Sequence, residues 1–189
     1  MQLILLCDTV SAHVLCKLYE GGAKVTTGLG LCLMPKACKN QAEISGEYKA
    51  HIKDGIAMCR FLSWLDDLTQ VEKISDPETF KRTVEDTDEG ILADRAESFR
   101  KVEQGYVEPS FATISALGPN AAMCHYNHEE VKTPKTLGED PIYLIDSGAH
   151  YLDGTTDITR TVLVGPGLTD EIKKMFTLVL KSHISFATA

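Results

Sequence analysis

The sequence predicts an α+β fold, and three patterns along its 189 residues carry that prediction. Residues 40–68 repeat apolar side chains every three to four positions, which is typical of a long amphipathic helix. Residues 109–126 are rich in β-branched side chains and interrupted by glycine and proline, which indicates short strands and loops. Residues 142–147 and 155–164 read as a strand pair around Asp153-Gly154, a dipeptide that favours hairpin turns.

The helix over residues 40–68 is the strongest single pattern in the chain. We expect it to turn an apolar stripe toward the core; the stripe consists of Tyr48, Ile52, Ile56, Cys59 and Leu62. Gly55 lies inside this helix, where glycine costs about 1 kcal/mol relative to alanine. We interpret Gly55 as a position where a packing partner approaches closely.

Further helices are predicted on either side of the strand pair. Asp76 followed by Pro77 is typical of a helix start. In the helix over residues 89–105, the side chains expected to face inward are Ile91 or Leu92, Ala96, Phe99 and Val102.

A last helix is expected after Thr169, a suitable N-cap residue. The side chains predicted to share one side of it are Ile172, Phe176, Val179 or Leu180, and Ile184.

Composition excludes several classes of function. The chain is 43% hydrophobic and 24% charged, as in ordinary globular proteins, and its net charge of −8 argues against nucleic acid as a partner. No apolar run approaches the roughly 20 residues of a membrane span. The six cysteines form no CxxC pair, so we expect free, mostly buried thiols in a cytoplasmic protein.

Asp146 and Asp157 are the first candidates for chemistry, because aspartate is depleted in strands. In a hairpin with an even-length loop, both side chains lie on the same face of the sheet. A four-residue loop makes them diagonal neighbours, and a six-residue loop makes them directly opposite. A two-residue loop on Asp153-Gly154 would separate them too far to cooperate, so a longer loop is part of the hypothesis.

Two neighbouring carboxylates need a counter-charge. At 4 Å and an effective dielectric constant of 20, their repulsion is about 4 kcal/mol. Arg160 is expected on the opposite face from Asp157, so a divalent cation such as Mn²⁺ is the simpler partner. The alternative is that Asp153 and Asp157 are solvated turn residues and that Asp146 caps the end of its strand.

His125 is the second candidate. It follows an apolar run and precedes Tyr126, which suggests a partly buried strand end beside a loop. An ordinary core or surface histidine is the alternative interpretation. The other five histidines show no ligand-like spacing.

Two segments of the chain resemble a known family. "PSFATISALGPNAAMCHY" over residues 109–126 and "YLIDSGAHYLDGTTDITRTV" over residues 143–162 are similar to the cytosolic aminopeptidase P family of pita-bread metallopeptidases. The resemblance covers about residues 35–189 and is most specific at "DSGAHYLDGTTDITR". It implies an incomplete pita-bread fold. Residues 39–189 would form the first half of the catalytic domain, and residues 1–38 the remnant of a preceding creatinase-like domain.

The resemblance also implies an activity. Members of the family hold two metal ions, usually manganese, with two aspartates, a histidine and two glutamates, and remove the first residue from peptides with proline second. Asp146 and Asp157 match the two aspartates as metal ligands, and His125 matches a histidine that lines the substrate site. An intact homodimer, acting on peptides in the cytoplasm, is implied with them.

The match is partial. The family's other three ligands would follow the last residue of this chain, so the sequence predicts weak or absent metal binding and no competent peptidase from this chain alone. We expect a truncation at both ends, with an apolar sheet face and open strand edges left uncovered. The alternatives are a prolidase-type dipeptidase and a non-catalytic module that binds a partner or peptide.

Overall fold

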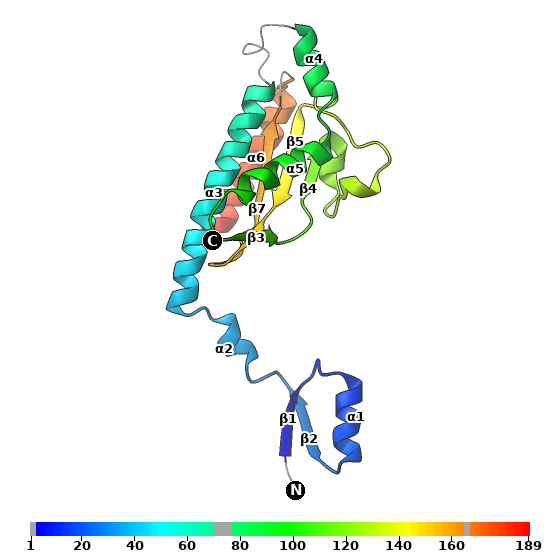
Figure 1. Cartoon of the computed structure of the whole chain (residues 1–189), viewed down its shortest axis with the longest axis vertical. Coiled ribbons are helices and arrows are strands. Elements are labelled where there is room, and N and C mark those ends of the chain that lie inside the picture. Colours follow the sequence, from blue (N-terminus) through cyan, green and yellow to red (C-terminus); the bar gives the residue numbers. More distant parts are fainter. Residues whose placement is uncertain (1–2, 70–76, 165–166) are drawn as a thin grey trace. The chain divides into compact units, whose positions relative to one another are not determined.

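The computed structural model describes residues 3–69, 77–164 and 167–189 of the chain (Figure 1). It divides into two compact units, Met1–Ser45 and Gly46–Ala189. The division falls inside a helix rather than at residue 38. The assignment of residues 1–38 to a preceding domain and of residues 39–189 to a catalytic domain stays a prediction.

The first unit is a small βαβ arrangement. Its elements are β1 (Leu3–Cys7), α1 (Ala12–Glu20), β2 (Lys24–Gly28) and α2 (Leu33–Ala37). β1 and β2 pair in parallel, which requires a crossover between them, and α1 supplies it. No residue of α1 or α2 is buried.

The second unit mixes helices and short antiparallel strands, as the α+β prediction expects. In chain order its elements are α3 (Gln41–Thr69), α4 (Pro77–Glu85), α5 (Glu89–Lys101), β3 (Tyr106–Pro109), β4 (Ile114–Leu117), η2 (Gly118–Ala122), η3 (His128–Glu130), β5 (Ile142–Ser147), β6 (Ala149–Tyr151), β7 (Ile158–Leu163) and α6 (Asp170–Ala187). Thr169 caps α6 as predicted, because its hydroxyl accepts a hydrogen bond from the Ile172 amide. Asp76, the expected cap of α4, lies outside the described residues.

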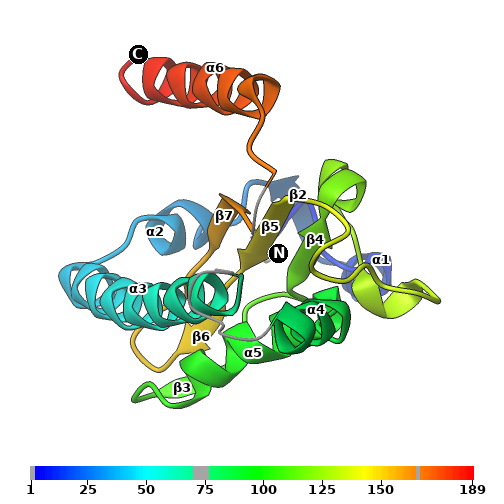
Figure 2. The same cartoon turned by 90° about the horizontal axis from the view of Figure 1, so that it is seen from above.

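The core lies between helices and one face of a sheet. Strand β5 is central in the order β4-β5-β7, and both pairings are antiparallel. Helices α3 and α5 lie on one side of these strands (Figure 2). The buried apolar cluster between the layers consists of Met58, Phe61, Leu65, Val84, Leu92, Ala96, Leu117, Leu137, Tyr143, Ile145 and Val164.

Strands β5 and β6 form one arm of a long hairpin, with a break at Gly148. Asp146 pairs with Thr159 and Ser147 with Ile158. The same register continues past the break, where the Thr156 amide donates to the Ala149 carbonyl. A side chain at Gly148 would collide with the carbonyl of Thr156, so the hairpin requires glycine there.

The hairpin ends in a loop of two residues, Leu152 and Asp153. Tyr151 and Gly154 exchange both of their backbone hydrogen bonds across it, at 2.8 and 3.3 Å. The turn was expected one residue later, on Asp153-Gly154. The prediction that a longer loop is required is therefore wrong. With the two-residue loop at Leu152-Asp153, Asp146 and Asp157 are already diagonal neighbours, which is the arrangement expected from a four-residue loop.

Helix α3 holds the tip of this hairpin. A Cβ at Gly46 would collide with the carbonyl oxygen of Asp153, so the helix and the loop are in direct backbone contact. Lys53 pairs with the Asp153 carboxylate. Glu47 accepts a hydrogen bond from the Thr155 amide at 3.4 Å.

A buried ion pair completes the docking. Arg100 donates two hydrogen bonds to Asp54, at 2.7 and 3.2 Å, and both side chains are 3% exposed. The Tyr151 hydroxyl donates to the same carboxylate at 3.1 Å. Burial and the neighbouring Asp54 raise the pKa of Tyr151, which keeps the phenol a donor. These contacts join α3, α5 and β6 at one point.

The predicted inner face of α3 is wrong except at Leu62, which is half-buried and packs against the core. Tyr48 and Ile52 are 71% and 64% exposed, and Ile56 and Cys59 are exposed as well. The buried face consists of Gly46, Ala50, Asp54, Ala57, Met58, Phe61, Leu65 and Thr69. Small residues of α3 contact the hairpin, and large residues are buried only near the sheet. The size of the apolar side chains therefore did not indicate which face of the helix is buried.

Gly55 is also not the close contact that was expected. A Cβ built there meets nothing within 4 Å, whereas Gly46, nine residues earlier, is in contact with backbone. In α5, Leu92 and Ala96 are buried and Phe99 packs against the core as predicted. Ile91 and Val102 are 47% and 72% exposed, and Val102 follows the end of the helix.

The cysteine prediction is half correct. All six thiols are free. None is buried, however: Cys7 is half-buried and the other five are exposed. Among the described residues, no helix is long and apolar enough to cross a membrane.

The two glycines of α3 provide a matched test of the docking. We expect Gly46→Ala to lower the free energy of unfolding by about 2 kcal/mol or more, because the clash is with backbone that no rotamer change relieves. Gly55→Ala, in the same helix with open space around it, should raise it by about 0.5–1 kcal/mol. Urea denaturation of the two variants measures both effects, and equal midpoints would contradict the docking.

Candidate metal centre

Asp146 lies near the end of central strand β5, on the face of the sheet that turns away from α3 and α5. Its strand neighbours Ile145 and Ser147 are buried on the helix side, whereas Asp146 alternates with half-buried Leu144 on the other side. One carboxylate oxygen, Oδ1, is buried and has no hydrogen-bond partner among the described residues. A buried oxygen of this kind is expensive unless a cation or a donor reaches it.

Asp157 shares that face. The ladder pairs Asp146 with Thr159, so Asp157, two residues before Thr159, is the diagonal neighbour of Asp146. Diagonal neighbours on one face lie about 7 Å apart, a distance from which two carboxylates can reach one ion. Gly148 faces Asp157 across the ladder, and the Thr156 carbonyl and the Ser110 hydroxyl fill the space that a side chain at Gly148 would take.

No basic side chain neutralises the pair from within the hairpin. Arg160 pairs with Ile145, on the helix side of the sheet, and donates to the Thr159 carbonyl at 3.4 Å. The face itself carries Ile114 of β4 beside Asp146 and Thr159 of β7 opposite it. Neither neighbour was predicted from the sequence, because alternation along one strand does not say which strand pairs beside it.

His125 is placed differently from the prediction. It is an exposed residue in a turn between η2 and η3, rather than a partly buried strand end. The turn is closed by the Tyr126 amide, which donates to the Met123 carbonyl at 3.2 Å. Strand β4 ends at Leu117, and the chain from there to His125 is short-helical, so the expected strand is absent from this described segment.

The two aspartates fit divalent cations, but they do not make a complete site. Carboxylate oxygens are the ligands that hard cations such as Mn²⁺ prefer, and an orphaned Asp146 oxygen suits that role. Over residues 3–69, 77–164 and 167–189, no group of three or more His, Cys, Asp or Glu side chains is arranged to hold a metal ion. Two ligands alone predict weak binding.

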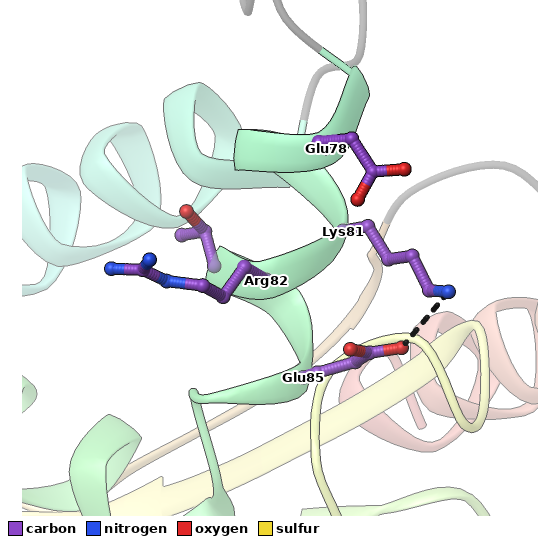
Figure 3. Close-up of a pocket in the computed structure, with 5 residues that line it drawn as sticks. Glu78, Lys81, Arg82 and Glu85 are labelled. Carbon is purple, nitrogen blue, oxygen red and sulfur yellow. Dashed lines mark ion pairs between the residues drawn. The ribbon is translucent and has the colours of Figure 1, made fainter.

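Two pockets formed by described residues lie away from the aspartates. The larger of these two, about 470 Å³, has α4 residues in its lining, among them Glu78, Lys81, Arg82 and Glu85 (Figure 3). Lys81 and Glu85 form an ion pair at 3.9 Å, and all of these charges come from one solvated helix. This hollow contains neither aspartate nor His125 and offers no convergent chemistry.

The sequence pattern of Metallopeptidase family M24 matches residues 47–189, which is most of the chain. The chain belongs to metallopeptidase family M24. The hairpin with its two aspartates, η2 and the His125 turn all lie inside the matched region.

Individual members of family M24 agree with this assignment. The chain is 40% identical over 178 residues to the Xaa-Pro aminopeptidase ApepP of Drosophila melanogaster, covering 94% of this chain and 27% of that protein. The crystal structure of X-prolyl aminopeptidase from Caenorhabditis elegans, described as a cytosolic enzyme with a di-nuclear active site, superposes with a TM-score of 0.72 at 35% identity. That superposition covers 85% of this chain and 24% of the other.

A prolidase structure is similar as well. The enzyme from Thermococcus sibiricus gives a TM-score of 0.69 at 25% identity, over 97% of this chain and 44% of its own. The predicted family and the mixed pita-bread fold are thus confirmed. The chain spans about a quarter of the length of the Drosophila relative.

Metal titration tests the aspartate pair on this chain directly. We expect Mn²⁺ to bind at millimolar or weaker affinity, and Asp146→Asn or Asp157→Asn to remove that binding, since each supplies half of the carboxylate charge. Asp153→Asn, in the same hairpin but paired with Lys53, is the matched control and should bind as the parent does. Isothermal titration with Mn²⁺ gives the comparison, and equal loss in all three variants would contradict the site.

Proposed function

We propose that this chain forms part of a metal-dependent X-Pro aminopeptidase, an enzyme that removes the first residue from peptides with proline in second position. The observation that carries the proposal is the Asp146 and Asp157 pair, on one open face of the sheet, with a buried carboxylate oxygen left without a partner. The 40% identity to an Xaa-Pro aminopeptidase supports the same substrate class.

Each side chain has a distinct role in the proposal. Asp146 and Asp157 would hold divalent ions, most simply Mn²⁺, through their carboxylates. Ions held there would supply Lewis-acid polarisation of the scissile carbonyl and acidify water. His125, exposed and close in sequence to the sheet end, lines the substrate site and donates a hydrogen bond to the reacting centre.

The chain alone should be inactive. The described residues offer no third ligand beside the aspartates, so we propose that the remaining ligands come from polypeptide outside these 189 residues. The exposed apolar side chains of α6, including Phe176, Val179 and Ile184, are consistent with a neighbour that covers them. The intact enzyme is proposed to be a cytosolic homodimer.

Two other functions remain as alternatives. A prolidase-type dipeptidase is favoured by the similarity to the Thermococcus sibiricus structure. A non-catalytic module that binds a partner or peptide is favoured by the incomplete ligand set. The length of the cleaved peptide distinguishes a prolidase-type dipeptidase from the proposed aminopeptidase. A dipeptidase cleaves only X-Pro, whereas an aminopeptidase also cleaves X-Pro-Y.

A chimera tests the proposal. This chain replaces the matched 178 residues in the Drosophila relative, and hydrolysis of an X-Pro dipeptide and an X-Pro-Y tripeptide is measured with Mn²⁺. We expect the tripeptide to be cleaved by the chimera and by neither the chain alone nor the chimera carrying Asp157→Asn. The loss should exceed about a hundredfold, because metal binding depends on that carboxylate.

Asp153→Asn serves again as the control within the hairpin. A folded, metal-loaded chimera that cleaves no X-Pro bond would contradict the aminopeptidase assignment, and cleavage of the dipeptide alone would favour the prolidase. Turnover by the chain alone would overturn the statement that it lacks ligands.

A further inference from the structure

Glu89, the first residue of α5, carries a fully buried carboxylate. Among the described residues, no basic side chain forms an ion pair or a hydrogen bond with it. Its position in the first helical turn favours negative charge. Nothing in the proposed chemistry uses it directly.

Four hydrogen-bond donors surround this carboxylate. Oε1 accepts from the Leu117 amide at 2.7 Å and from Asn120 Nδ2 at 2.9 Å. Oε2 accepts from the Tyr126 hydroxyl and from the Lys135 amide at 3.1 Å. An ionised carboxylate only accepts hydrogen bonds and has about four lone-pair sites, so the donors fill it completely.

All four donors belong to one segment of the chain, residues 117–135. Leu117 ends β4, Asn120 lies in η2, Tyr126 follows the turn, and Lys135 ends the segment. A connection of this length without long helices or strands is unusual and is commonly functional. The single side chain of Glu89 therefore anchors it at its beginning, its middle and its end.

Backbone contacts reinforce the far end of the segment. The Glu89 amide donates to the Lys135 carbonyl at 3.1 Å, and the Leu137 amide donates to the Thr87 carbonyl at 2.9 Å. Asn120 also donates to the Tyr126 hydroxyl at 3.0 Å. Burial and the Glu89 carboxylate raise the pKa of Tyr126, so its hydroxyl keeps its proton for this bond.

The anchored residue Tyr126 is the immediate neighbour of His125. Tyr126 is 5% exposed while His125 is exposed, so the anchor faces inward and the histidine outward at adjacent positions. The segment leaves β4 where Leu117 pairs with Tyr143, three residues along β5 from Asp146. That separation corresponds to about 10 Å along the strand.

We infer that Glu89 is a positioning residue, whose carboxylate fixes the 117–135 segment and thereby sets where His125 stands relative to the sheet face with the two aspartates. The functional part of this inference rests on the proposed role of His125. The carboxylate acts through Tyr126 and touches neither substrate nor metal. Its isostere glutamine cannot replace it, because the amide group turns one acceptor oxygen into a donor that faces two other donors.

NMR on this chain tests the positioning without any activity. We expect Glu89→Gln to shift the His125 imidazole signals and to speed the exchange of the Leu117 or Lys135 amide at least about tenfold. Glu97→Gln, two turns along α5 and bonded to Tyr106 instead, is the matched control and should leave His125 unchanged. Tyr126→Phe removes one donor and keeps the carboxylate. If Glu89→Gln does not fold, a shift of the His125 signals in Tyr126→Phe still tests whether Glu89 positions His125 through Tyr126.

Kinetics in the chimera test the functional consequence. Glu89→Gln should lower kcat about tenfold with little change in KM, because His125 would be misplaced at the reacting centre rather than in ground-state binding. In a His125→Ala background the same change should cost less than about twofold, since the residue it acts through is gone. A merely structural role would give the same loss in both backgrounds.

The outcomes are separable. His125 signals that stay unchanged in Glu89→Gln and Tyr126→Phe, or additive losses in kcat, would overturn this inference. A chimera without X-Pro hydrolysis in any form would instead contradict the proposed function. The NMR response of His125 would then still establish whether Glu89 positions it.

Discussion

The docking of the hairpin tip against α3 is the contact on which the rest of the second unit depends. Gly46 lets the helix touch the Asp153 carbonyl, and Asp54, Arg100 and Tyr151 lock the same end by buried hydrogen bonds. Because side chains alternate along a strand, a slip of one residue would move every side chain of the hairpin to the other face. Holding the tip therefore decides which face carries Asp146 and Asp157.

That constraint explains what the sequence could and could not predict. Strand periodicity alone placed Asp146 and Asp157 on one face, since parity holds for any even-length loop. Their diagonal spacing depends on a turn at Leu152-Asp153, which is chosen by contact with α3 and not by the local Asp153-Gly154 dipeptide. The register of the hairpin strands therefore depends on a long-range contact, which a local sequence pattern cannot predict.

The same limit applies to the helix and to the histidine. The apolar stripe with Tyr48 and Ile52 gave α3 its correct extent but the wrong inner face, because the tip requires small residues and an ion pair at Asp54. His125 was expected at a strand end because its neighbours are apolar. It stands on a turn instead, since Tyr126 is held inward by Glu89, an acid 37 residues before Tyr126 that no local pattern connects with it.

Three carboxylates with buried oxygens show how differently the fold treats such groups. Asp54 and Glu89 are buried whole, whereas Asp146 is half-buried and has only its Oδ1 inside. Asp54 receives an arginine and a tyrosine, and Glu89 receives four neutral donors, so each is satisfied by residues of this chain. At Asp146 the buried Oδ1 receives no donor from the described residues, although its neighbour Asp157 adds a like charge. A fold that satisfies Asp54 and Glu89 so fully would not leave the third unpaired by default, because an uncompensated buried charge costs several kcal/mol. We propose that the positive charge which Asp146 lacks would come from a divalent cation shared with Asp157, on the face of the sheet opposite α3 and α5.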